Sequence, residues 1–237
     1  MDLTAQPAPP PGVILAAGAA ALLIVLVPVV WRFARTGITI THEGGHALMA
    51  VLTGRRLRGI RLHSDTSGLT VARGKPRGLG MILTLSAGYL APSLLGLGAA
   101  ALLSAGYVTL LLWIALVLLF AVLVMIRNWY GLLAVLVTGG LVYAVTRYAA
   151  AQTQSAVAFA AAWFLLLGGV KPVWEVARRR RGGAYRSDPD QLARVTGVPA
   201  VVWIVLIGLI NIACLLYGGA LLLDGSGFTL SALPFAR

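Results

Sequence analysis

The chain contains, within an otherwise apolar run, the sequence Ile40-Thr41-His42-Glu43-Gly44-Gly45-His46-Ala47-Leu48-Met49-Ala50. This stretch holds the pattern His-Glu-x-x-His. Residues four apart lie on the same face of an α-helix, so His42 and His46 can both reach one metal ion. Glu43 is not needed as a ligand, and its carboxylate can take a proton from a metal-bound water. Zinc suits this arrangement because it lowers the pKa of bound water toward neutrality.

The surroundings of this pattern favour a functional interpretation over a chance match to a short motif. The chain has three histidines, and two of them stand in the pattern. The pattern also lies in a membrane-like segment, where ionisable groups are costly and are usually functional. We therefore interpret His42 and His46 as zinc ligands and Glu43 as the catalytic base.

The composition indicates a membrane protein. Of 237 residues, 59% are hydrophobic and 11% are charged, which is too apolar for a soluble globular domain. The net charge of +12 comes from cations in short loops between apolar spans, so we interpret it as a determinant of membrane orientation rather than of nucleic-acid binding. The single cysteine, Cys214, excludes an internal disulfide bond and is expected to be a packing residue.

The expected fold is an all-α membrane protein with about six or seven transmembrane helices and one short β-hairpin. Residues 1–11 form a Pro-rich leader that we expect to be disordered. The first apolar run is long enough to span and has no basic residue before it, so we expect a permanent anchor. The expected spans are 12–30, 37–52, 79–104, 108–126, 129–145, 156–169 and 198–222.

The hairpin is predicted in the basic segment 54–78, directly after the motif helix. Apolar residues alternate on both sides of a turn cluster, with Ile60 and Leu62 before residues 64–68 and Leu69 after them. A bare hairpin is only marginally stable in water. We therefore expect it to rest on the helices or on the membrane surface.

A second basic segment, the loop 171–194, contains the run Arg178 to Arg181. The positive-inside rule places this loop, Arg127 and the hairpin segment in the cytoplasm. The arginine run is also expected to attract anionic lipid headgroups. This orientation predicts a cytoplasmic N-terminus, an external C-terminus and a motif near the cytoplasmic side of the membrane.

Three segments together resemble the site-2 protease family of intramembrane zinc metalloproteases, and most closely a divergent bacterial branch of it. They are the motif His42 to Leu48, the hairpin end Ser67-Gly68-Leu69-Thr70 and the turn Ser86-Ala87-Gly88-Tyr89-Leu90-Ala91-Pro92. The resemblance covers about residues 37–140. The order of motif, hairpin and glycine turn carries it, because each segment alone is weakly specific.

The resemblance implies a zinc metalloendopeptidase of the cell membrane. His42 and His46 would hold zinc, and Glu43 would activate water to hydrolyse a peptide bond in or near a transmembrane segment of another protein. A regulatory membrane partner is also implied. The metalloprotease-like core would be 12–150, with C-terminal spans and the basic loop in 151–237. We interpret the small residues of the third span as packing residues without a functional role; they are Gly80, Ser86, Gly88, Gly96 and Gly98.

The chain departs from the family at the third zinc ligand. The family uses an Asp in a later span, in a pattern like Asn-x-x-Pro followed by Asp-Gly. Here the corresponding stretches are Asn128-Trp129-Tyr130-Gly131 and Thr138-Gly139-Gly140, which contain no Asp. Catalytic zinc normally has three protein ligands and one open position, so a replacement is required.

The few acidic residues limit the replacements. Three of them, Glu175, Asp188 and Asp190, are assigned to the basic loop and set aside. Asp65 in the hairpin is then the leading candidate, with His63 and the carbonyl oxygen of Asn128 as alternatives. For both Asp65 and His63 we favour an ordinary hairpin role over zinc binding. Asn128 can instead bind the substrate backbone that unwinding of a helix exposes.

Two other classes of function compete with the peptidase. The missing Asp supports a catalytically inactive pseudoprotease that acts as a membrane binding or scaffold protein. A metal transporter is disfavoured, because the spans carry no further carboxylates or histidines for a permeation path. For the peptidase, the hairpin is expected to hold an extended substrate strand by edge pairing.

Overall fold

The computed structural model describes residues 4–183 and 187–224, so residues 1–3 of the expected leader lie outside the described part. It confirms a mostly helical chain with one two-stranded antiparallel sheet. The elements are α1 (Pro11–Leu26), α2 (Pro28–Leu52), β1 (Arg56–Leu62), β2 (Gly68–Arg73), α3 (Leu79–Ser104), α4 (Val108–Met125), α5 (Trp129–Tyr148), α6 (Ala151–Arg181), α7 (Asp188–Thr196) and α8 (Ala200–Asp224).

Among the described residues, five helices are long and apolar enough to cross a membrane: α3, α4, α5, α6 and α8. The pair α1 and α2 passes the same test only together, with a bend of 102° between the two helices. The sequence predicted two separate spans at 12–30 and 37–52. In the structure the motif helix α2 begins at Pro28, within the first of these segments, and continues to Leu52. Proline lacks an N–H group and favours the first turn of a helix, so α1 ends and α2 begins at this point.

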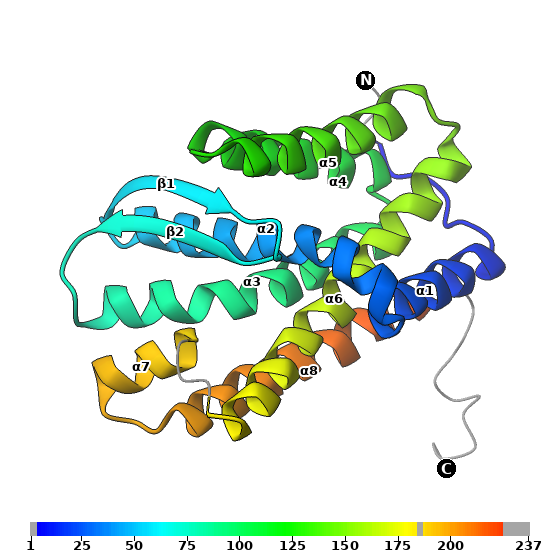
Figure 1. Ribbon diagram of the computed structural model, residues 1–237. Helices are drawn as coiled ribbons and strands as arrows, with labels where there is room; N and C mark the ends of the chain where they lie inside the picture. The colour runs from blue at the N-terminus through cyan, green and yellow to red at the C-terminus, as the bar shows by residue number, and fades with distance from the viewer. Residues whose placement is uncertain (1–3, 184–186, 225–237) are drawn as a thin grey trace, which may run out of the picture.

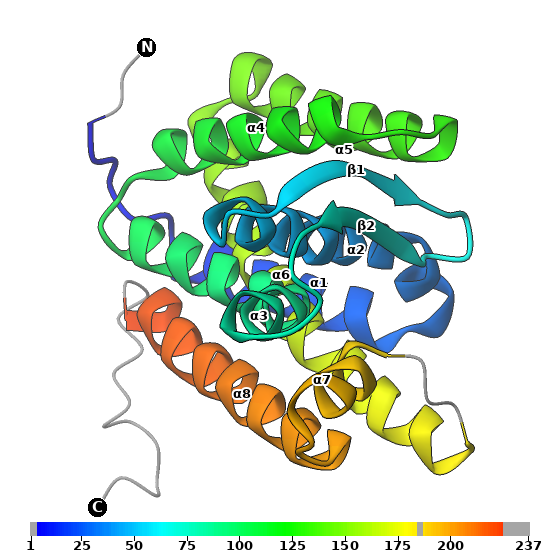
Figure 2. The same cartoon turned by 90° about the vertical axis from the view of Figure 1, so that its left-hand side faces the viewer.

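Helix α3 lies at the centre of the arrangement and packs against α2, α6 and α8. Helix α1 packs against α6, and their apolar side chains, including those of Ile14, Phe159 and Leu166, form the largest buried cluster together with α3 and α8. The hairpin lies on α2, and the antiparallel pair α4 and α5 lies on the far side of the hairpin (Figure 2).

The two ends of the helix bundle differ in charge. The open end of the hairpin, the α4–α5 junction and α7 lie at one end, on the left in Figure 1, and most of the cations stand in or next to these segments. The α3–α4 and α5–α6 junctions lie at the other. The backbone N–H of Gln6 donates to the carbonyl oxygen of Gly106 at 2.9 Å, which places the leader beside the α3–α4 junction. The described start of the chain is therefore at the end opposite the basic segments, unlike the expected arrangement.

The hairpin forms where it was predicted, with Arg56 opposite Arg73 and Leu62 opposite Gly68. The outer edge of β1 is already paired, because Ile60 forms a parallel bridge with Ile126 and its carbonyl oxygen accepts from the N–H of Arg127 at 2.9 Å. Strand β2 forms the other edge of the sheet, and both strands contact α2.

Candidate metal centre

The two motif histidines converge on the face of α2 that meets α3. The Nε2 atoms of His42 and His46 lie 3.1 Å apart. His46 is buried, and its Nδ1 lies 2.6 Å from the carbonyl oxygen of Thr84 on α3. A carbonyl can only accept, so Nδ1 carries a proton, and Nε2 is the nitrogen that faces the cluster. The hydrogen bond to Thr84 thereby orients the imidazole of His46 with Nε2 toward the cluster.

The third member of the cluster is Asp188, the first residue of α7. Its Oδ2 lies 3.2 Å from the Nε2 of His42 and 3.2 Å from the Nε2 of His46. One ligand atom from each of the three residues lies within 4.8 Å of the other two. Burial alone would raise the pKa of Asp188, but the hydrogen bonds and charges of the two histidines outweigh it and hold the pKa well below its usual range. The carboxyl group is therefore ionised at neutral pH and can act as an anionic metal ligand.

The assignment of Asp188 to a basic loop, away from the histidines, was wrong. Residues 188–196 form a short helix that packs against α3 and α8 and returns the chain to the motif. The sequence around it held the information, because Ser187 is an N-cap, Pro189 stands in the first turn and Asp190 completes a capping box. These residues predict the start of a helix, whereas the many arginines nearby had indicated a loop.

The structure does not bring Asp65 to the histidines. Its Oδ1 accepts from the backbone N–H of Ser67 at 2.9 Å and from the Ser67 hydroxyl at 2.6 Å, which lowers the pKa of this exposed carboxyl. Asp65 is thus a turn residue, and Asp188 holds the place that it was expected to take. His63 is exposed too, and its Nδ1 lies 3.3 Å from the Ser67 hydroxyl.

Glu43 is buried on α2 and is held by the hairpin. The hydroxyl of Thr70 on β2 donates to its Oε2 at 2.6 Å and lies 3.1 Å from its backbone carbonyl oxygen. On the same strand, a Cβ at Gly68 would collide with Oε1 and the carboxyl carbon of Glu43. Thr70 therefore orients the carboxylate, and the missing side chain at Gly68 leaves it room.

Gly88 makes the corresponding space for the histidines. A Cβ there would lie 2.7 Å from the Nε2 of His42 and closer still to the Nε2 of His46. The expectation that Gly88 serves only helix packing was therefore too narrow. Gly45 is the packing glycine, since a Cβ there would lie 2.8 Å from the carbonyl oxygen of Ala87 on α3.

Asn128 binds the hairpin rather than the histidines. Its Oδ1 accepts from the N–H of Leu62 at 3.1 Å, and its Nδ2 donates to the carbonyl oxygen of Leu62 at 2.6 Å. Both polar atoms of the side chain are therefore occupied by the end of β1. In the structure Asn128 fixes the hairpin to the α4–α5 junction, and the proposed role in zinc binding has no geometric support.

These groups line one cavity of about 570 Å³. His42, Glu43 and His46 contribute from α2, Gly68 to Thr70 from β2, and Asp188 from α7. The ring of Tyr89 packs edge-on against His42, with 4.7 Å between ring centroids. The Glu43 carboxylate beside two histidines and a second carboxylate, that of Asp188, with an open space in front of them, has the layout of a hydrolytic metal site.

A comparison with protein-family models finds a match to the Peptidase M50B-like family over residues 15–218. The chain belongs to this family. The match confirms the resemblance to the site-2 proteases, which are multi-pass membrane metalloproteases, and extends it well beyond residues 37–140, so that α7 and Asp188 are included. The comparisons with curated proteins and with solved structures find no match.

Proposed function

We propose that the protein is an intramembrane zinc metallopeptidase whose zinc ligands are His42, His46 and Asp188. The convergence of two Nε2 atoms and one carboxylate oxygen within 4.8 Å supports this proposal most strongly. Two neutral imidazoles and one carboxylate match the donor set of catalytic zinc sites, which leave a fourth position open for water or substrate. The hydrogen bond from His46 to Thr84 adds the outer support that such ligands normally have.

Glu43 is the proposed general base. Bound zinc would supply an acidified water and polarise the scissile carbonyl. Thr70 engages Oε2 of Glu43, so Oε1, which faces Gly68, is the atom that takes the proton from the attacking water. The same carboxyl group can then protonate the leaving amine.

The proposed substrate is a transmembrane segment of another membrane protein, bound as an extended strand against β2. Helical segments must unwind to be cut, and their exposed amides then need partners. The outer edge of β1 is occupied by the α4–α5 junction, whereas Gly68 to Thr70 of β2 line the catalytic cavity. Edge pairing with β2 would place the substrate backbone beside Glu43. A regulatory membrane partner remains a prediction from the family resemblance.

The proposed location is the cell membrane, with the basic end of the bundle in the cytoplasm. If α1 and α2 form one broken span, six spans result, and both ends of the helical region lie on the external side. This reverses the expected cytoplasmic N-terminus, in agreement with the contact between Gln6 and Gly106. Arg55 and Arg179 of the basic segments line the catalytic cavity, so the proposed site lies toward this end of the bundle.

The pseudoprotease hypothesis loses its main support. It rested on the lack of a carboxylate as the third metal ligand, and Asp188 supplies one next to both histidines. Glu43 is also present and oriented.

Cleavage can be tested by co-expressing the protein with a panel of single-span membrane proteins that carry a tag at each end. The wild-type protein should release fragments from at least one of them, and Glu43→Gln should abolish release while the variant still binds zinc. Identical fragments with both proteins would assign the cleavage to another protease and refute the proposed role of Glu43.

A further inference from the structure

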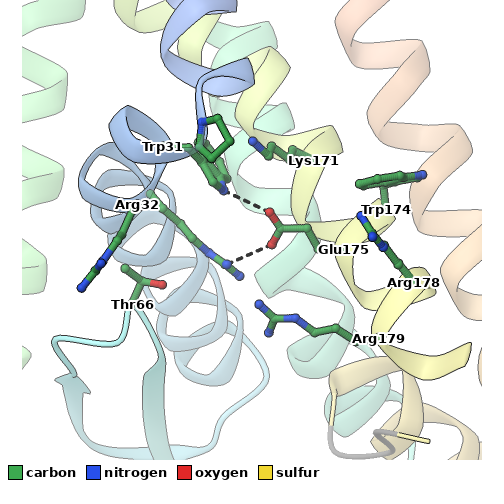
Figure 3. Close-up of a pocket in the computed structure, with 10 residues that line it drawn as sticks. Trp31, Arg32, Thr66, Lys171, Trp174, Glu175, Arg178 and Arg179 are labelled. Atoms are coloured by element: carbon green, nitrogen blue, oxygen red, sulfur yellow. Dashed lines mark hydrogen bonds and ion pairs between the residues drawn. The ribbon is translucent and has the colours of Figure 1, made fainter. Parts of the chain in front are cut away.

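A second cavity, of about 620 Å³, lies between the first turns of α2 and the second half of α6 (Figure 3). Its lining is strongly basic. Five cationic side chains contribute to it: Arg32, Arg35, Lys171, Arg178 and Arg179. One carboxylate, that of Glu175, and the two indoles of Trp31 and Trp174 complete the charged and aromatic lining.

Glu175 is fully engaged within this pocket. Its Oε1 accepts from the Nε1–H of Trp31 at 3.0 Å, and its Oε2 pairs with Arg35 at 2.9 Å. Five cations and one carboxylate leave an excess of four positive charges among the lining residues. Such an excess in one pocket of a membrane protein favours an anionic partner, because an anion offsets the repulsion between like charges at close range.

The remaining cations are available to that partner to different degrees. Lys171 donates to the carbonyl oxygen of Val25 and lies 4.6 Å from the ring centre of Trp31. Arg178 lies 5.7 Å from the ring centre of Trp174. The side chains of Arg32 and Arg179 are exposed, and neither guanidinium forms a hydrogen bond or ion pair with another residue in the described part of the chain. Their guanidinium groups are free to bind phosphate in a forked geometry.

The surroundings of the pocket are those of a lipid rather than of a free ion. The basic half of α6 follows its apolar half, so Lys171 and Arg178 stand where a span leaves the hydrocarbon. Trp174 is 60% exposed, as expected of an indole at the headgroup level. Next to the basic residues, α2 exposes Val29 and Phe33, which lie four residues apart on one face and are 69% and 73% exposed. The site thus combines a positively charged pocket with an exposed apolar face of α2.

We propose that this pocket binds the phosphate of an anionic phospholipid, with an acyl chain lying along Val29 and Phe33. The pocket shares Arg35, Thr66 and Arg179 with the catalytic cavity. Thr66 forms the hairpin turn, with a left-handed φ of 67°, and its carbonyl oxygen accepts from the Thr39 hydroxyl at 2.8 Å. A lipid headgroup at this position contacts the end of the hairpin and couples membrane composition to the position of β2.

The experiment is native mass spectrometry of the detergent-purified protein titrated with phosphatidylglycerol or with phosphatidylcholine. The test variant is Arg32→Gln/Arg178→Gln, since both side chains are exposed. The matched control is Arg56→Gln/Arg58→Gln, which removes the same charge from exposed positions of β1. The measurement needs no peptidase activity, so it is independent of the proposed catalytic function.

The wild-type protein and the control should retain one phosphatidylglycerol in preference to phosphatidylcholine. The pocket variant should bind it about tenfold to thirtyfold more weakly, as expected for the loss of two cations near a lipid headgroup. The proposal fails if both double variants lose affinity equally, which would show a general surface charge. It also fails if inorganic phosphate alone binds as tightly as the lipid, or if an acidic peptide binds where phosphatidylglycerol does not.

Discussion

Gly88→Ala is predicted to disrupt the metal centre although it replaces none of the proposed ligands. The added Cβ would lie 2.7 Å from the Nε2 of His42 and closer to that of His46, whereas unstrained contacts require about 3.5 Å. The imidazoles must therefore move by roughly 1 Å, and metal ligands tolerate only about 0.2 Å. We expect zinc affinity to fall at least tenfold to hundredfold, the usual effect of disturbing the support of a ligand.

Gly98→Ala is the matched control on the same helix, because a Cβ at Gly98 would meet no atom within 4 Å. Alanine favours a helix over glycine by up to about 1 kcal/mol, so this control should be neutral or slightly stabilising. Zinc affinity is measured by competition with a chromogenic chelator, and stability by thermal unfolding in the same detergent. If Gly88→Ala binds zinc as tightly as Gly98→Ala, the assigned site geometry is wrong.

Three further variants test the groups around the site. Thr70→Val removes the hydroxyl that orients Glu43. It should lower kcat about tenfold to hundredfold and leave the zinc content unchanged. An unaltered kcat would contradict the orienting role of Thr70. Gly68→Ala should reduce cleavage more strongly, because its Cβ would displace the Glu43 carboxylate, and cleavage at the wild-type rate would refute that assignment. Asn128→Ala leaves both backbone groups of Leu62 without their partner and should cost about 1–3 kcal/mol of local stability, seen as faster hydrogen exchange in the hairpin; unchanged exchange would argue against the clamp.

The local patterns of the sequence were sufficient for the motif helix and the hairpin. Helical spacing alone predicts that His42 and His46 face the same side, and alternation around the turn 64–68 predicts a hairpin in the segment 54–78, which the structure forms from β1 and β2. Both depend on contacts between residues close in the sequence. The bend at Pro28 is also readable from the chain, but deciding whether α1 and α2 are one span or two requires their packing against α6.

The third ligand could not be predicted from local sequence patterns. Asp188 is 142 residues from His46 in the chain, and only the return of the chain at α7 brings it to the site. The arginines around it predicted a solvated loop, whereas the N-cap residue Ser187 and the capping box with Asp190 start a helix there. Gly68 and Gly88 could not be assigned from sequence either, since their function is to leave space for side chains of another element.

The central claim is that zinc is held by His42, His46 and Asp188. The most direct measurement is the zinc content of detergent-purified Asp188→Asn beside Asp65→Asn, a matched change at a carboxylate that the structure places outside the cluster. The account predicts about one zinc per chain in the wild-type protein and in Asp65→Asn, and its loss in Asp188→Asn after dialysis against a weak chelator. Retention of zinc by Asp188→Asn together with its loss from Asp65→Asn would contradict the account and return the third ligand to the hairpin.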